Sequence, residues 1–351
     1  MAWLIKALAW LVLGVLLALA AIWSWSAGLN PYWPVIFVAF AGFSLFRSFK
    51  AFVEVWRSRL SKRVEIEVAA EKDTYLPGDA VNVSVRVMDK EELDIEEGRV
   101  ALVCANRYVY QYTTTDSDDN QIYRTEEATD EVAAADERIL EEKTILSGSY
   151  SAHEVAFEVP SAAAPSASGE ITNVEWKVRV TLLIRGAPDV IEEIPLTVLS
   201  SSESYASWAE SAPVLDSHGV CVMEFRLPGR SFRLGERKEG TLVVTPHQDF
   251  KARTLRVELA RAEVVSRDSG NFSETVEAGE VVDESPRYQT RASREYAFAM
   301  DVPGAAGPCL QTEQTYVAWR LKATMVRGMA FDPDLQQLLN VYNGPTTTAE
   351  R

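Results

Sequence analysis

The sequence predicts an all-β soluble region, made of two tandem antiparallel β-sandwiches, that follows an α-helical membrane hairpin. Three observations predict this arrangement. Residues 7–46 contain no charged side chain. Past residue 63, apolar and polar residues alternate in short runs, which is typical of strands with one buried face. Finally, a set of turn and core residues from the first half of this region recurs in the second half at a constant spacing.

The composition is that of a folded, acidic protein. The chain has 351 residues, and 47% of them are hydrophobic, which excludes disorder throughout. Its 35 Lys and Arg against 51 Asp and Glu give a formal net charge of −16, which repels phosphate and disfavours a nucleic-acid partner. The three cysteines imply no disulfide framework.

The uncharged run Ala7–Phe46 is about twice as long as one membrane-spanning helix requires. Turn residues interrupt it at Ser24–Pro31, so we expect one helix over about 7–23 and a second over about 33–49. Aromatic residues gather at the turn, where an interfacial belt would lie: Trp23, Trp25, Tyr32 and Trp33. The lipid bilayer is therefore a predicted partner of residues 1–63.

Basic residues set the predicted orientation of this hairpin. Lys6 precedes the first helix, and a basic collar follows the second: Arg47, Lys50, Arg57, Arg59, Lys62 and Arg63. The positive-inside rule then places the N-terminus and the large C-terminal region on the cytoplasmic side of a plasma or inner membrane. A cleaved signal peptide ending near Leu19-Ala20-Ala21, or a re-entrant second segment, would change this topology.

The soluble region contains an internal repeat. Phe157-Glu158-Val159-Pro160, Pro165 and Trp176 recur 143 positions later as Met300-Asp301-Val302-Pro303, Pro308 and Trp319. Upstream, Tyr75-Leu76-Pro77-Gly78-Asp79 recurs 157 positions later as Phe232-Arg233-Leu234-Gly235-Glu236. We therefore expect domains over 64–200 and 213–343, a linker over 201–212, and a tail over 344–351. The difference of 14 between the two spacings predicts a longer middle segment in the first copy.

These repeated residues have predicted structural roles. Gly78 and Gly235 permit the turn before a strand, and Pro160 and Pro303 end a strand because proline lacks the donor that the ladder needs. Trp176 and Trp319 are expected to anchor the two cores. The residues given such roles are Tyr75, Pro77, Gly78, Asp79, Pro160, Pro165 and Trp176 in the first copy, and Phe232, Gly235, Glu236, Pro303, Pro308 and Trp319 in the second.

The repeated elements resemble the arrestin family, including its bacterial and archaeal members of the sporulation-control type. The first copy is similar to the first domain of that family, and the second copy resembles the second domain more loosely. The resemblance implies arrestin-like (immunoglobulin-like) sandwiches and a non-enzymatic scaffold that binds membrane-associated proteins. The N-terminal hairpin departs from soluble arrestins, and recognition of phosphoproteins is not carried over.

A search for chemistry finds no strong catalytic or metal motif. His153, His218 and His247 lack metal-ligand spacing. The cysteines at 104, 221 and 309 are far apart, and Cys104 lies in an apolar run that predicts a buried thiol. We therefore predict no catalytic residue, no metal site and no cofactor.

Two acidic segments of the first copy remain open to interpretation. Asp116, Asp118, Asn120 and Glu127 match positions of a calcium-binding loop, but Gln121 replaces the required glycine, and a solvated acidic loop explains them better. The segment Thr125–Leu146 is the predicted long insert of the first copy. It is rich in helix formers, so we expect a short acidic helix or a mobile excursion there.

Taken together, the sequence predicts a membrane-anchored, arrestin-like adaptor or scaffold that binds another protein, membrane-associated itself, from the cytosolic side. The alternative is an extracytoplasmic, membrane-anchored β-sandwich protein in envelope assembly or adhesion, which requires the signal-peptide or inverted topology. An enzyme would need a pocket built from residues distant in sequence.

Overall fold

The computed structural model describes residues 12–13, 15–23, 38–40, 43, 64–89, 93–115, 120–141, 143–145, 150–186, 188–212, 214–216, 219–328 and 331–346. The predicted membrane hairpin falls mostly outside these residues. Trp23 is described, and it is helical and exposed. Trp25, Trp33 and the six basic residues from Arg47 to Arg63 lie outside the described residues. Within the described part, no helix is both long and apolar enough to cross a membrane.

The first half of the β-region forms a pair of sheets that face each other. The smaller sheet has the order β1 (Val64–Ala70), β3 (Ala80–Asp89), β7 (Tyr150–Glu158). The larger has the order β2 (Thr74–Tyr75), β10 (Val190–Val198), β9 (Thr172–Ile184), β4 (Leu93–Thr115), β5 (Gln121–Leu140), with β6 (Lys143–Ile145) on β4 and β8 (Ala167–Ser168) on β9. The alternation read in the sequence becomes the burial pattern, since Val81, Val83, Val85 and Val87 are all buried.

The second half repeats this strand order, with β13 in the place of β2 and with β11 as an added strand. Its smaller sheet has the order β12 (Cys221–Arg226), β14 (Arg237–Pro246), β19 (Arg294–Asp301). Its larger sheet has the order β11 (Leu215–Asp216), β22 (Asp334–Tyr342), β21 (Thr315–Val326), β16 (Thr254–Val265), β17 (Asn271–Glu284), with β13 (Ser231–Arg233) on β22 and β20 (Leu310–Gln311) on β21. A small two-stranded sheet pairs β15 (Phe250–Lys251) with β18 (Arg287–Tyr288). The prediction of two tandem β-sandwiches is therefore confirmed.

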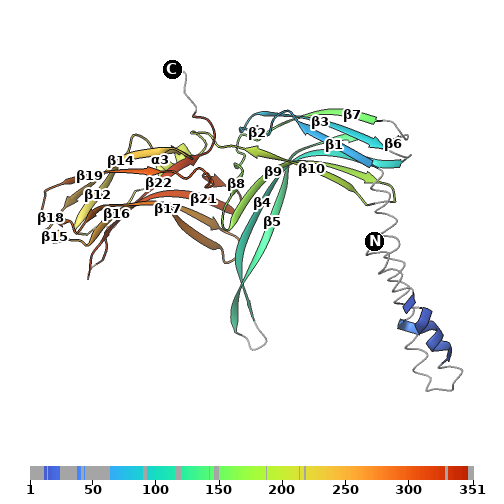
Figure 1. Ribbon diagram of the computed structural model, residues 1–351, viewed down its shortest axis with the longest axis horizontal. Coiled ribbons are helices and arrows are strands. Elements are labelled where there is room, and N and C mark those ends of the chain that lie inside the picture. The colour runs from blue at the N-terminus through green and yellow to red at the C-terminus, as the bar shows by residue number, and fades with distance from the viewer. Residues whose placement is uncertain are drawn as a thin grey trace.

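Figure 1 shows the two sandwiches side by side, with the long β4–β5 hairpin projecting from the first. The segment that links the two sandwiches in sequence forms the short helix α3 (Ala206–Ser211), which packs on β22 of the second sandwich. The prediction for Thr125–Leu146 is wrong in its helical form. Residues up to Leu140 belong to β5, which pairs with β4 from Gln121 onward. The helix propensity of the alanines is overridden because β4 offers a complete ladder and Ala134 and Ala135 pack against the core.

The extra length of the first copy lies at the end of this hairpin. Tyr108 pairs with Ala128 across β4 and β5, whereas the equivalent Val265 pairs with Asn271 across β16 and β17. The additional residues therefore fall within 109–127, closer to the N-terminus than Thr125–Leu146. As a result the hairpin of the first domain extends past its own sandwich toward the second domain.

Candidate functional site

The repeated turns have the same geometry in both domains. Gly78 and Gly235 have φ angles of +88° and +80°, a conformation that favours glycine. Gly78 N donates to Val159 O at 2.8 Å, and Gly235 N donates to Val302 O at 2.9 Å. Each turn is thereby tied to the residue that follows β7 or β19, just before the proline at 160 or 303.

The other predicted structural residues lie around these turns. Tyr75 and Phe232 are buried. Pro165 and Pro308 are also buried, whereas Pro77, Pro160 and Pro303 are half-buried. Asp79 Oδ2 accepts a hydrogen bond from Leu76 N at 2.8 Å, and Glu236 Oε2 pairs with Lys238 Nζ at 2.7 Å. The two acidic residues of the motif therefore have local partners within a few residues.

Each core tryptophan makes the same hydrogen bond. Trp176 Nε1 donates to Ala164 O at 2.8 Å, and Trp319 Nε1 donates to Gly307 O at 3.0 Å. Both side chains are almost fully buried. Donor and acceptor are 12 residues apart in each case, so the two domains share this buried hydrogen bond as well as the sequence motif.

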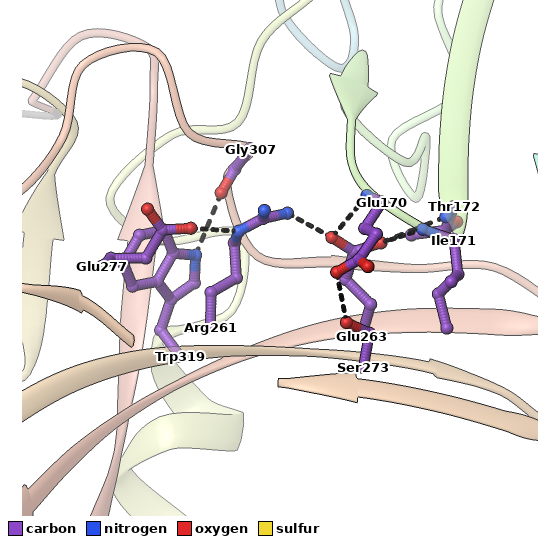
Figure 2. A network of polar contacts seen from close by, with 9 residues as sticks. All are labelled: Glu170, Ile171, Thr172, Arg261, Glu263, Ser273, Glu277, Gly307 and Trp319. Carbon is purple, nitrogen blue, oxygen red and sulfur yellow. Dashed lines mark hydrogen bonds and ion pairs between the residues drawn. The ribbon is translucent and has the colours of Figure 1, made fainter. Parts of the chain in front are cut away.

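The contact between the two domains is centred on a buried carboxylate. Glu263, on β16 of the second domain, is only 2% exposed. Its oxygens accept hydrogen bonds from the backbone N–H groups of Glu170, Ile171 and Thr172 in the first domain, at 2.9, 2.8 and 3.1 Å (Figure 2). Its charge is balanced by Arg261, whose Nη1 lies 2.5 Å from Glu263 Oε1. A buried carboxylate needs this full set of donors to offset its loss of hydration.

Two further contacts extend this network (Figure 2). Arg261 Nε donates to Glu277 Oε1 at 2.7 Å, so the guanidinium lies between two carboxylates of its own domain. Ser273 Oγ donates to Glu170 Oε2 at 2.5 Å across the contact. Gly169 completes the fit, because an added Cβ would lie 2.5 Å from Glu263 Cδ.

A second contact mirrors the first. Asn106 Nδ2 donates to Thr312 Oγ1 at 2.9 Å, and Thr315 Oγ1 donates to Asn106 Oδ1 at 3.3 Å. Asn106 on β4 and Glu263 on β16 are equivalent positions of the repeat, since each lies two residues beyond the partner of its core tryptophan. The turns that they reach, 312–315 and 169–172, are equivalent as well. The two domains therefore meet through a quasi-two-fold contact, in which a strand of each domain forms hydrogen bonds with a turn of the other domain.

Aromatic side chains of the long hairpin close one side of this contact. Tyr108 and Tyr110 are buried and pack with Val265 of the second domain. The guanidinium of Arg267 lies 4.7 Å from the centre of the Tyr110 ring and donates to Tyr108 Oη at 2.8 Å. Tyr108 Oη in turn donates to Asp130 at 2.7 Å. These contacts hold the hairpin against the second domain.

The outer face of the first large sheet carries an ion-pair cluster. Glu131 pairs with Lys177 Nζ at 2.9 Å and with Arg179 Nη2 at 2.7 Å. Glu193, on β10, pairs with the same two basic residues at 3.1 and 2.5 Å. The hydrogen bonds from Lys177 and Arg179 hold the pKa of Glu131 below its usual value. These ion pairs span β4, which lies between β5 and β9 in the sheet.

The second domain repeats this cluster in altered form. Glu274 pairs with Lys322 and, at 3.7 Å, with Arg320. These three residues lie 143 positions after Glu131, Arg179 and Lys177. The position of Glu193 is taken by Gln336, which donates to Asp334 Oδ2 at 3.1 Å. One carboxylate of the first cluster is therefore missing from the second.

Cys104 and Glu127 both lie on the long hairpin of the first domain. Cys104 is half-buried on β4, and burial raises the pKa of its thiol to about 11, which makes it a poor nucleophile at neutral pH. Asp116 and Asp118 lie outside the described residues, while Glu127 lies on β5 and pairs with Arg107 at 3.4 Å. Among the described residues, no group of three or more His, Cys, Asp or Glu could hold a metal ion.

The residues of the interdomain contact were missed by sequence reasoning, although one signal marks them. The alternation Leu255, Val257, Leu259 continues along β16 into Arg261 and Glu263, so two charged residues occupy positions of the buried register. A charge in such a position needs a partner from another element. Only the fold shows that the partners of Glu263 are backbone N–H groups of the other domain.

Comparison with known protein families finds a match over the first sandwich. Residues 60–203 match the family model of the arrestin (or S-antigen) C-terminal domain. This range contains β1–β10, so the first sandwich is an arrestin-like domain. The sequence resemblance pointed instead to the first domain of the family, so the match corrects which of its two domains the first sandwich is similar to. No curated protein matches the chain significantly.

Proposed function

We propose that this protein is a non-enzymatic adaptor that binds another protein, and that residues 1–63 anchor it in a plasma or inner membrane. The observation that carries the proposal is a pair of similar sandwiches, the first of them arrestin-like, joined by a contact built from buried polar groups. Because that contact fixes the two large sheets relative to each other, the molecule presents a defined, extended surface to a partner.

Membrane anchoring is supported by the charge pattern of the N-terminal region. The uncharged run Ala7–Phe46 and the basic residues from Arg47 to Arg63 favour a two-pass hairpin with the sandwiches on the cytosolic side. The partner of such an adaptor is a protein of the same membrane.

Affinity co-purification from gently solubilised membranes tests the adaptor. The full chain is compared with a version that lacks residues 1–63, whose β-rich circular dichroism spectrum is checked first. We expect the full chain to recover a specific membrane protein, and recovery by the truncated form assigns the binding to the sandwiches. If neither form recovers a specific protein, the adaptor proposal fails.

The orientation is tested by labelling with a membrane-impermeant maleimide. Tyr123 is 72% exposed, so Tyr123→Cys provides a reactive thiol on the first domain. We expect labelling above the parent protein only after the cells are opened. Labelling in intact cells would instead support the extracytoplasmic alternative.

A further inference from the structure

A pocket of about 290 Å³ lies on the outer face of the second large sheet, beside the helix α3. Its walls include Tyr205, Trp208, Leu310, Tyr316, Arg320 and Leu338. Tyr316 and Arg320 project from β21 on the side opposite the buried Trp319. Leu310 belongs to the hydrophobic core, and Tyr205 and Trp208 pack against that core, so the pocket lies at its edge. Its volume is at the lower end of the range for ligand sites, which fits one or two side chains of a peptide better than a large ligand.

Hydrogen bonds fix both walls of this pocket. Tyr205 Oη accepts from Gln311 N at 3.1 Å, which ties the start of the helical segment to β20. Arg230 Nη1 donates to Ala209 O at 2.8 Å and to Glu210 O at 3.2 Å at the end of α3. The pocket is therefore preformed, and a ligand does not have to order it.

The internal repeat shows that the lining is specific to the second domain. Tyr316, Ala318 and Leu338 occupy the positions that Asn173, Glu175 and Pro195 occupy in the first domain. In the first domain Asn173 Nδ2 donates to Glu175 Oε1 at 2.9 Å, so the same face is polar and its groups are satisfied internally. The second domain has replaced this polar surface with an aromatic and aliphatic one.

The ion pairing of the basic residue at the pocket also differs between the two domains. Lys177 of the first domain lies between two carboxylates, at 2.9 and 3.1 Å. The equivalent Arg320 has one ion-pair partner within the described part of the chain, Glu274 at 3.7 Å. Gln336 stands where the second carboxylate would be. A guanidinium at the edge of an aromatic pocket is thus available to an incoming carboxylate.

We propose that this pocket binds a short peptide segment of the protein partner, in which a carboxylate lies next to a large apolar side chain. Arg320 binds the carboxylate, and Trp208, Tyr316 and Leu338 hold the apolar side chain. The net charge of −16 repels strongly acidic ligands, so a segment with a single carboxylate is preferred over an acidic run. This inference rests on the proposed adaptor function and names one surface through which it acts.

The test uses the full chain in detergent and fluorescein-labelled pentapeptides followed by fluorescence anisotropy. The probe is Gly-Ser-Phe-Asp-Gly with an amidated C-terminus, and the controls replace Phe by Ala or Asp by Asn. We expect saturable binding of the probe and at least about tenfold weaker binding of either control, because each control lacks one of the two recognised groups. Absence of saturable binding by the probe would overturn the proposal.

The repeat supplies matched variants. Arg320→Gln and Gln336→Glu are both expected to weaken binding about tenfold, the second because it restores the carboxylate found at Glu193 in the first domain. Lys177→Gln, at the equivalent position of the first domain, is the control and should leave binding unchanged. Equal binding by all three variants would contradict the proposal, as would phenylacetate binding as tightly as the peptide, because the site would then be one for small acids.

Co-purification with the same variants separates this proposal from the adaptor function. If Arg320→Gln and Gln336→Glu lose the membrane partner while Lys177→Gln keeps it, the pocket is the partner's site. If all three keep the partner, the adaptor function stands and the pocket proposal is wrong.

Discussion

Asn106 and Glu263 occupy equivalent positions of the two repeats, and each side chain binds the turn of the opposite domain. The chemistry of the two contacts differs. Asn106 exchanges neutral hydrogen bonds with Thr312 and Thr315, whereas Glu263 brings a charge that requires three backbone donors and Arg261. The charged hydrogen bonds of the contact therefore lie in one of its two halves.

This asymmetry predicts unequal effects of substitution. Glu263→Gln replaces one carboxylate oxygen, which accepts from backbone N–H groups, with an amide that donates, and it leaves Arg261 with one carboxylate. We therefore expect the free energy of unfolding to fall by about 3–5 kcal/mol. Asn106→Ala removes neutral hydrogen bonds and should cost about 1–3 kcal/mol. Thermal and urea unfolding of the full chain measures both, with the partly exposed Glu274→Gln as a control expected to change stability by less than about 1 kcal/mol. Equal effects of Glu263→Gln and Glu274→Gln would contradict this account.

Gly169 is expected to tolerate no side chain while Glu263 keeps its hydrogen bonds. Alanine at this position places Cβ 2.5 Å from Glu263 Cδ, and the carboxylate is held by four hydrogen bonds, so it cannot move cheaply. Gly169→Ala should destabilise the chain by about 1–3 kcal/mol. In a Glu263→Ala background the same change should cost much less, and a double-mutant cycle measures the difference. Additive effects in that cycle would show that the two residues are independent.

The two core tryptophans should respond alike when their hydrogen bond is removed. Phenylalanine keeps an aromatic ring but leaves the buried carbonyl of Ala164 or Gly307 without its donor. Trp176→Phe and Trp319→Phe are therefore each expected to cost about 1–3 kcal/mol from the unsatisfied acceptor. Urea unfolding measures both, and Tyr150→Phe, at a side chain that is 72% exposed, serves as the control. A neutral effect of either tryptophan substitution would show that the hydrogen bond is dispensable.

Stability should fall in acid partly through Glu131. Its pKa is lowered in the folded state by hydrogen bonds from Lys177 and then Arg179, so its contribution is present above the unfolded pKa of about 4.3 and is lost as the pH falls through the folded value. At pH 7, Glu131→Gln should cost less than about 1 kcal/mol, because the pair is partly exposed. The difference from the parent protein should shrink as the pH falls from 5 to 3 in thermal unfolding. A difference that is constant over this range would contradict the assignment.

The fold was largely predictable because its signals are local. Val81 to Val87 alternate over one strand, and the spacing of Pro160 and Trp176 recurs in Pro303 and Trp319. The role of Arg261 and Glu263 in the interdomain contact was missed because the partners of Glu263 lie in a turn about 90 residues earlier in the chain. The strand β5 was mistaken for a helix or a mobile segment because its alanines favour helix, and the ladder that overrides this propensity is supplied by β4.

The quasi-two-fold contact resembles the isologous interface of a homodimer, except that one chain supplies both halves. In a dimer of separate chains, such a contact would dissociate on dilution. Here the segment around α3 holds the two surfaces at a high effective concentration, so the contact forms whatever the abundance of the protein. The two halves differ all the same: Lys177 of the first domain pairs with two carboxylates, whereas the equivalent Arg320 pairs with Glu274 and lies beside aromatic rings.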